Sequence, residues 1–268
     1  MEKERETDKA FAPLTVIKVG GAVVEDEAQL TRLINDFSAI PGRKVLVHGG
    51  GRRATKVAAA LGIESKMVDG RRITDKAMLE VVTMVYGGLV NKNVVAQLQA
   101  EGINALGLTG ADINVIRSHK RPLKNGIDYG FVGDVDHADG NMLKTLIEAG
   151  IVPVMAPLTH DGKGNMLNTN ADTIASETAK ALAPYYDVTL TFCFEKKGVL
   201  ANPDDDDSVI PVITPQLFRK YVADGTISGG MMPKIENSLA ALNAGVKQVV
   251  ITKADTLGSQ TGTKILAE

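Results

Sequence analysis

The sequence lacks features on which several classes of protein depend. It contains one cysteine, Cys193, in an apolar stretch, so an intrachain disulfide is excluded and a buried structural thiol is expected. No apolar run approaches the roughly 20 residues that a membrane-spanning helix needs. The charged segment from Met1 to Ala10 lacks the apolar core of a signal peptide. We therefore expect a cytoplasmic protein without a membrane partner.

The sequence also lacks a large excess of either charge and any metal-binding pattern. The net charge is −2 at pH 7 and the pI is about 6.1, which does not indicate a nucleic-acid partner. The four histidines show no metal-ligand spacing. The run from Asp204 to Asp207 lacks the spaced ligands and the glycine of a calcium loop, so we interpret it as a solvated loop.

Short β-branched runs alternate with longer helical patterns over 268 residues, a length that allows one large or two small domains. Because the strand candidates are continuously apolar, we expect them to be buried on both faces of a mainly parallel sheet with helical crossovers. The predicted strands are 14–19, 44–48, 103–107, 151–155, 188–193 and 248–252. The predicted helices are 25–39, 52–61, 75–99, 141–149, 171–182, 215–223 and 231–244.

Capping and turn residues indicate where these elements begin and end. Thr74 and Asn170 stand at predicted N-cap positions. Segments 114–135 and 159–169 break the alternation and predict hairpins, and Ala183-Pro184 predicts a joint between domains. Four glycines follow helical stretches as C-terminal caps do: Gly62, Gly102, Gly150 and Gly245.

Two lysines beside glycine loops give the first indication of function. Lys18 ends a predicted strand before Gly20-Gly21, and Lys234 closes a segment that contains Gly229-Gly230. Glycine lets the backbone approach a charged ligand closely, and a helix that starts after such a loop points free N–H groups at an anion. Two such loops predict a polyphosphate site that grips the terminal phosphoryl group from both sides.

A third glycine loop, Gly49 to Gly51, leaves two interpretations open. Together with Ala54 it satisfies the G-x-G-x-x-A form of the dinucleotide fingerprint, and Asp69 lies somewhat beyond, which would indicate an NAD-binding oxidoreductase. It is also compatible with a tight strand–helix turn that binds nothing. The NAD interpretation leaves the two lysines unexplained.

Two polar segments add candidate ligands for a small anion. Asn170 is explained as a helix cap, but Asn168 and Asp172 are explained less well in this way. A carboxylate between two lysines would hold both and keep them protonated. Arg71 and Arg72 precede a predicted helix, and an arginine can bind a carboxylate through two parallel hydrogen bonds. A solvated basic turn is the alternative for this pair.

In this order, the segments resemble the amino acid kinase family, and within it the branch that phosphorylates acylglutamates. Lys-x-Gly-Gly at 18–21 is shared across the family, whereas Asn-x-Asn-Ala-Asp at 168–172 and Gly-Gly-Met-x-Pro-Lys at 229–234 are much more specific to the branch. The resemblance runs from about Leu14 to Leu266. It implies a three-layer αβα sandwich, with an acylglutamate-binding and dimerisation lobe at 1–183 and an ATP-binding lobe at 184–268.

The resemblance also implies an activity: ATP- and Mg²⁺-dependent phosphorylation of the side-chain carboxylate of an N-acyl-L-glutamate, for arginine biosynthesis, by a homodimer. The chemistry agrees, because a carboxylate with a reference pKa of ~4.3 needs no general base. It needs positioning and electrostatic stabilisation. By position in the motifs, Lys18 and Lys234 would be catalytic, with Asp172 organising both. The acylglutamate would be held by Gly49, Gly50, Arg72 and Asn168, and ATP by Gly20, Gly21, Gly198, Gly229, Gly230 and Glu195.

The chain departs from the family pattern in two places. Phe194-Glu195-Lys196 replaces a usual Thr/Ser-Asp-Val, so the adenine contacts are left open. Arg71 replaces an apolar residue, and a second guanidinium would suit an acyl group with its own carboxylate, so N-succinylglutamate stands beside N-acetylglutamate as substrate. Alternatively, Arg71 points to solvent or pairs with Asp69. A kinase of the aminoadipate type and a catalytically silent sensor are further alternatives, although the intact lysines argue against a sensor.

Overall fold

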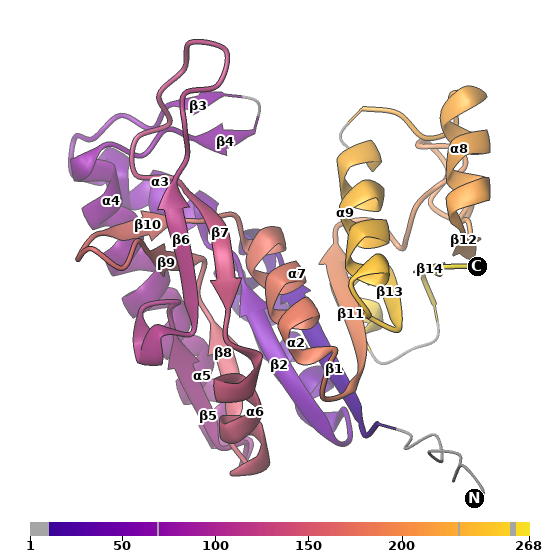
Figure 1. Cartoon of the computed structure of the whole chain (residues 1–268), viewed down its shortest axis with the longest axis horizontal. Coiled ribbons are helices and arrows are strands. Elements are labelled where there is room, and N and C mark those ends of the chain that lie inside the picture. Colours follow the sequence, from indigo (N-terminus) through magenta and orange to yellow (C-terminus); the bar gives the residue numbers. More distant parts are fainter. Residues whose placement is uncertain (1–10, 69, 230, 258–260) are drawn as a thin grey trace, which may run out of the picture.

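An eight-stranded sheet lies between two layers of helices in the computed structural model, which describes residues 11–68, 70–229, 231–257 and 261–268 (Figure 1). The strand order is β12-β14-β13-β11-β1-β2-β8-β5, and all neighbours are parallel except β13 and β14. The predicted αβα sandwich is confirmed, and each predicted strand lies in this sheet. The strands are β1 (Pro13–Val19), β2 (Arg43–His48), β5 (Ala105–Leu108), β8 (Val152–Met155), β11 (Asp187–Phe194), β12 (Val212–Ile213), β13 (Gln248–Lys253) and β14 (Thr263–Ile265).

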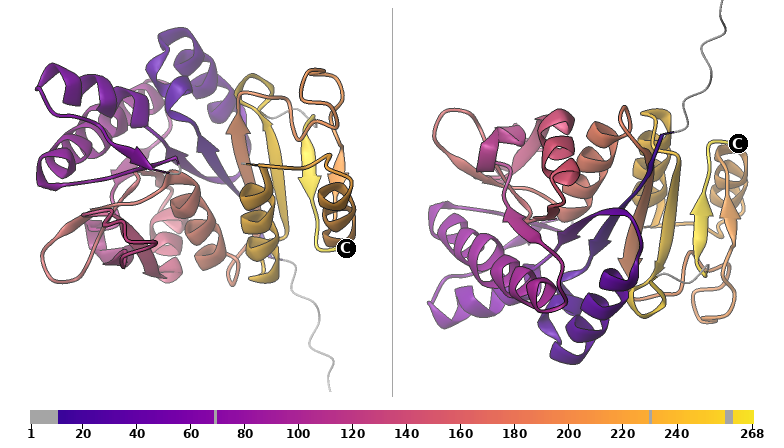
Figure 2. Two further views of the ribbon diagram at one scale, coloured as in Figure 1. Left: turned by 90° about the horizontal axis from the view of Figure 1, so that it is seen from above. Right: turned by 90° about the horizontal axis from the view of Figure 1, so that it is seen from below.

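The helices cover the two faces in chain order, α1 to α5 on one face and α6 to α9 on the other (Figure 2). Successive residues of a strand point to opposite faces, so on β1 Leu14 and Val16 pack on one side and Ile17 and Val19 on the other. None of the described helices is both long and apolar enough to cross a membrane. The helices are α1 (Gly21–Glu25), α2 (Glu27–Ala39), α3 (Gly51–Ala60), α4 (Lys76–Val82), η1 (Thr83–Val90), α5 (Asn91–Ala100), α6 (Gly140–Glu148), α7 (Ala171–Leu182), α8 (Pro215–Ala223) and α9 (Met231–Asn243).

Strand β1 is central to this sheet. It pairs with β2 on one side, and on the other its seven residues from Pro13 to Val19 pair with Asp187 to Cys193 of β11. A strand from the N-terminal part of the chain therefore pairs directly with a strand from the C-terminal part. In the sequence, these two strands lie on opposite sides of the predicted joint at Ala183-Pro184. The main sheet is continuous through both predicted lobes.

Two smaller sheets, one of two antiparallel strands and one of four strands in mixed orientation, complete the fold and confirm the predicted hairpins. Segment 114–135 contains β6, the loop to β7 and the first residues of β7, and segment 159–169 overlaps the β9–β10 hairpin. A further hairpin, β3–β4, carries the two arginines and projects at the top of Figure 1. The strands are β3 (Met67–Val68), β4 (Arg71–Arg72), β6 (Ile116–Lys120), β7 (Gly133–Ala138), β9 (Leu158–His160) and β10 (Met166–Asn168).

Side-chain caps fix where several helices begin. Asn170 accepts hydrogen bonds from the N–H groups of Asp172 and Thr173 at the start of α7, as predicted. The predicted cap at Thr74 is wrong, because Asp75 accepts the bond from Met78 N–H at 2.8 Å. The C-terminal caps are confirmed by positive φ angles of 73°, 75°, 77° and 98° at Gly62, Gly102, Gly150 and Gly245.

The contact between α6 and α7 generates a prediction about stability. A Cβ on Gly140, the first residue of α6, would lie 1.8 Å from the carbonyl oxygen of Ala181 in α7. Since that atom is backbone, we expect Gly140→Ala to lower the free energy of unfolding by about 1–3 kcal/mol in urea titrations. Gly88→Ala is the matched control, because nothing lies within 4 Å of its Cβ position in η1. Equal stability of the two variants would contradict the interpretation.

Candidate active site

The glycine loops after β1 and β2 lie against each other at the carboxyl ends of these parallel strands. Gly49 N–H donates to the Val19 carbonyl at 2.9 Å. A Cβ on Gly49 would lie 2.8 Å from Gly21 N, and a Cβ on Gly21 would lie 3.0 Å from Gly50 N. Helices α1 and α3 begin in these loops, so the free N–H groups of two helix starts are at the same edge of the sheet.

A buried histidine holds the second loop. His48 has no exposed surface, its Nδ1 donates to the Gly49 carbonyl at 2.8 Å, and its Nε2 accepts from the Asn91 amide at 3.1 Å. Burial lowers the pKa of His48 to about 4, so the ring is neutral at pH 7. Because a trans peptide directs C=O and N–H to opposite sides, fixing the Gly49 carbonyl also fixes the direction of Gly50 N–H.

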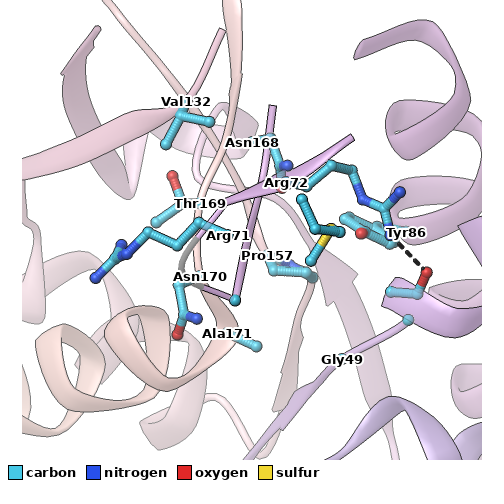
Figure 3. A pocket seen from close by; sticks show the side chains of 14 residues that line it. Gly49, Arg71, Arg72, Tyr86, Val132, Pro157, Asn168, Thr169, Asn170 and Ala171 are labelled. Atoms are coloured by element: carbon cyan, nitrogen blue, oxygen red, sulfur yellow. Dashed lines mark hydrogen bonds between the residues drawn. The ribbon is translucent and has the colours of Figure 1, made fainter. Parts of the chain in front are cut away.

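A cavity of about 190 Å³ lies beside this loop, between the β3–β4 hairpin and the start of α7 (Figure 3). Arg72 enters it from β4 with only 8% of its surface exposed. Its guanidinium donates to the Gly51 carbonyl and to the hydroxyls of Thr55 and Ser65, each at 2.8 Å. Tyr86 lines the same wall, and a Cβ on Gly50 would lie 2.9 Å from its ring, so Gly50 is required to admit the tyrosine.

Arg71 lies on the opposite wall of this cavity. Figure 3 shows its side chain extending toward Thr169 and Asn170, away from Arg72, as expected of neighbours in a strand. Arg71 is exposed and makes no hydrogen bond or ion pair with any residue that the structure describes. Asp69, the predicted alternative partner, lies outside the described residues.

Thr74 joins the elements that carry the predicted substrate residues. Its buried hydroxyl accepts a hydrogen bond from the Asn168 amide at 2.9 Å and donates to the Arg72 carbonyl at 3.2 Å. Its backbone N–H also donates to the Tyr129 carbonyl in the loop between β6 and β7. This role of Thr74 is not evident from the sequence, in which a threonine before a predicted helix indicates a cap.

The two lysines approach each other at the end of the sheet. Lys18, the penultimate residue of β1, is nearly buried, and its Nζ lies 2.8 Å from Asp172 Oδ1 in the first turn of α7. Lys234 lies in the first turn of α9, with its Nζ 3.7 Å from the centroid of the Phe194 ring. Burial lowers the pKa of Lys234, and the charge of Asp172 partly opposes this shift. Asp172 therefore contacts Lys18 but acts on Lys234 only at longer range.

A second cavity, of about 500 Å³, lies on the other side of the glycine loops. It is lined by Lys234 and by five of the residues that the sequence analysis named: Gly20, Gly21, Phe194, Glu195 and Gly198. Glu195 forms an exposed ion pair with Arg52 of α3 at 2.9 Å. Gly229 precedes α9 without lining this cavity, and Gly230 lies outside the described residues.

The single cysteine lies next to these residues. Cys193 is buried, and burial raises the pKa of its thiol to about 12. The thiol therefore stays protonated at neutral pH, which confirms the expected buried position and agrees with a structural role.

Comparisons with known proteins identify the family of this chain. The chain is 70% identical over 252 residues to acetylglutamate kinase from Bacteroides thetaiotaomicron. The aligned region covers 94% of this chain and 98% of that protein. The chain is 69% identical to acetylglutamate kinase from Phocaeicola vulgatus with the same coverage. The crystal structure of smu.665 from Streptococcus mutans UA159 superimposes with a TM-score of 0.77 at 31% identity, over 95% of this chain and 99% of that chain. Since residues 13–253 match the family model as well, the chain belongs to the amino acid kinase family.

Proposed function

We propose that this protein is an ATP-dependent kinase that phosphorylates the side-chain carboxylate of an N-acyl-L-glutamate, with N-acetylglutamate as its substrate in arginine biosynthesis. The observation that carries the proposal is the pair of cavities on either side of the glycine loops, with Lys18, Asp172 and Lys234 beside them. Relatives at 70% and 69% identity bear the name acetylglutamate kinase. These relatives give no support to the NAD-binding oxidoreductase or to a kinase of the aminoadipate type.

The chemistry that we propose is a direct transfer. A carboxylate oxygen of the acylglutamate attacks the γ-phosphorus of ATP, and the bond from that phosphorus to the β,γ-bridging oxygen breaks, so acyl phosphate and ADP form. The difficulty is that two anions must approach each other. Lys18, Lys234 and the N–H groups of the two glycine loops would stabilise the charge on the moving phosphoryl group.

The acylglutamate would occupy the cavity of about 190 Å³. Arg72 and Asn168 line it, as do Gly49 and Gly50. Arg72 already donates to three protein oxygens and to Met78 Sδ at 3.9 Å, so a substrate carboxylate would take the remaining Nε–H or replace one of these acceptors. The network through Thr74 would keep Asn168 and Arg72 in fixed relative positions while this happens.

ATP would occupy the cavity of about 500 Å³, which is lined partly by residues 20–52 and partly by the lobe that we assign to residues 184–268. Gly20, Gly21 and Gly198 line it. Gly229, which precedes α9, would add an N–H group, and Gly230 remains a candidate from the sequence motif alone. Mg²⁺ is usually bound by substrate phosphates with one or two carboxylates. Because the described residues hold no cluster of three or more His, Cys, Asp or Glu side chains, and Glu195 is paired with Arg52, Mg²⁺ would be held here mainly by the phosphates of ATP. We place the enzyme in the cytoplasm because the substrates of this reaction are soluble metabolites.

The first test is acyl phosphate formation from Mg²⁺-ATP and N-acetylglutamate, trapped as a hydroxamate. We expect Lys18→Ala and Lys234→Ala each to lower kcat by about 100-fold or more, since each removes stabilisation of the transferred group. Lys247→Ala is the matched control, because Lys247 forms an exposed ion pair with Asp187 away from both cavities. Unchanged kcat in both site variants would rule out the proposed mechanism.

Arg71 generates a prediction about the acyl group. Its exposed guanidinium lines the acylglutamate cavity, so it would suit an acyl chain that ends in a carboxylate, as in N-succinylglutamate. We expect Arg71→Leu to lower kcat/KM for N-succinylglutamate relative to N-acetylglutamate by roughly 10- to 150-fold, the value of one well-formed arginine–carboxylate contact. Arg53→Leu, on the exposed side of α3, is the control. An unchanged ratio in Arg71→Leu would remove succinyl as a candidate.

We also propose that the protein is a homodimer. Strand β5 is the edge of the main sheet, and Leu106 on it is 38% exposed. Met84 and Leu89 of η1 are 55% and 41% exposed, so apolar area is available for a second copy. We expect light scattering to give the mass of a dimer, and the double variant Met84→Glu/Leu89→Glu to give a monomer. A monomeric wild-type protein at micromolar concentration would contradict the proposal.

A further inference from the structure

Phe194 lies close to both lysines of the site. It is the last residue of β11, and its ring centroid is 3.7 Å from Lys234 Nζ and 5.4 Å from Lys18 Nζ. The ring stacks on the buried ring of Phe192, with 6.0 Å between centroids and 17° between planes. The pairing of β11 in the sheet and the stacking on Phe192 hold the Phe194 ring in place. The position of this ring relative to the two lysines is therefore fixed.

The two lysines differ in what holds them. Lys18 has an anionic partner, because Asp172 Oδ1 lies 2.8 Å from its Nζ. No carboxylate of the described residues lies within 4 Å of Lys234 Nζ. The ring of Phe194 is therefore the closest attractive group that the structure gives to Lys234, since the face of an aromatic ring attracts a cation.

We propose that Phe194 is the positioning residue of Lys234 in the phosphoryl transfer, which rests on the proposed kinase function. The ring holds the ammonium group at the wall of the nucleotide cavity without neutralising it. A carboxylate at this place would cancel the charge and repel the incoming triphosphate. A neutral ring does neither, so the full charge of Lys234 remains available to the transferred group.

This proposal gives a role to Phe194, one of the residues at which the chain departs from the family pattern. Phe194 stands where Thr or Ser is usual, and neither of those side chains can make a cation–π contact. The sequence analysis left this residue unexplained because its contacts with residues 18 and 234 depend on the strand order. Phe194 also lines the nucleotide cavity, so a direct contact with ATP is the competing explanation that an experiment must separate.

A double-mutant cycle tests whether the ring acts through the lysine. We expect Phe194→Leu to lower kcat by about 3- to 30-fold, the value of one cation–π contact, and to leave the KM for N-acetylglutamate unchanged. In the Lys234→Ala background the same substitution should change kcat by less than about twofold, because coupled residues are not additive. Phe194→Tyr keeps the ring and should stay within about threefold of the wild type. Phe218→Leu in α8 controls for the loss of a partly buried phenylalanine.

Several outcomes would overturn the inference. An equal loss of kcat from Phe194→Leu in both backgrounds would mean that the ring acts independently of Lys234. A raised KM for ATP with unchanged kcat would assign Phe194 to nucleotide binding, and a loss in Phe194→Tyr equal to that in Phe194→Leu would exclude the ring as the cause.

A second readout separates this inference from the proposed function. In NMR spectra the Cε protons of Lys234, assigned by their absence in Lys234→Ala, should be shifted by the ring current in the wild type and in Phe194→Tyr. They should lose this shift in Phe194→Leu. If the wild type forms no acyl phosphate but shows the shift, the kinase function fails while the contact stands. If the shift is absent from the wild type, the positioning role fails whatever the activity.

Discussion

Gly21 and Gly49 lie so close to the neighbouring loop that neither position has room for a side chain. This contact follows from the parallel pairing of β1 and β2, which brings both loops to one edge of the sheet. The cavity with the two arginines lies on one side of the contact, and the cavity with Lys234 lies on the other. The distance between two ligands bound there is therefore set mainly by backbone, which is stiffer than any arrangement of side chains.

The same edge of the sheet also concentrates positive charge in a protein that is nearly neutral overall. The chain as a whole has a net charge of −2, yet Lys18, Lys234 and Arg72 gather where α1, α3, α7 and α9 begin. The starts of α1 and α3, which have no side-chain cap, add N–H groups to this region. Such an arrangement attracts anions at the site without making the rest of the surface basic, so selectivity for a charged ligand does not require a charged protein.

The fold could be predicted from sequence because its signals are local. The bounds predicted for α7 and α8 match the structure, since an Asn cap and a Thr-Pro start mark where each helix begins. Contacts between distant segments could not be predicted in this way. Tyr86 against Gly50, and Phe194 beside Lys234, depend on strand order and on which helix face turns inward. The assignment of Thr74 failed for a related reason, because its hydroxyl bonds to Asn168 across the fold rather than along its own helix.

The central position of β1 has a consequence for how the chain folds. One edge of this strand can pair with β2 as soon as β2 exists, but the other edge pairs with β11, whose first paired residue is Asp187. During synthesis at the ribosome, a mostly apolar strand is therefore left with an open edge until most of the chain has emerged. The sheet centre closes late and through contacts of high sequence separation, which slows folding. The open edge of β1 is accordingly a site at which nascent chains of this protein can aggregate.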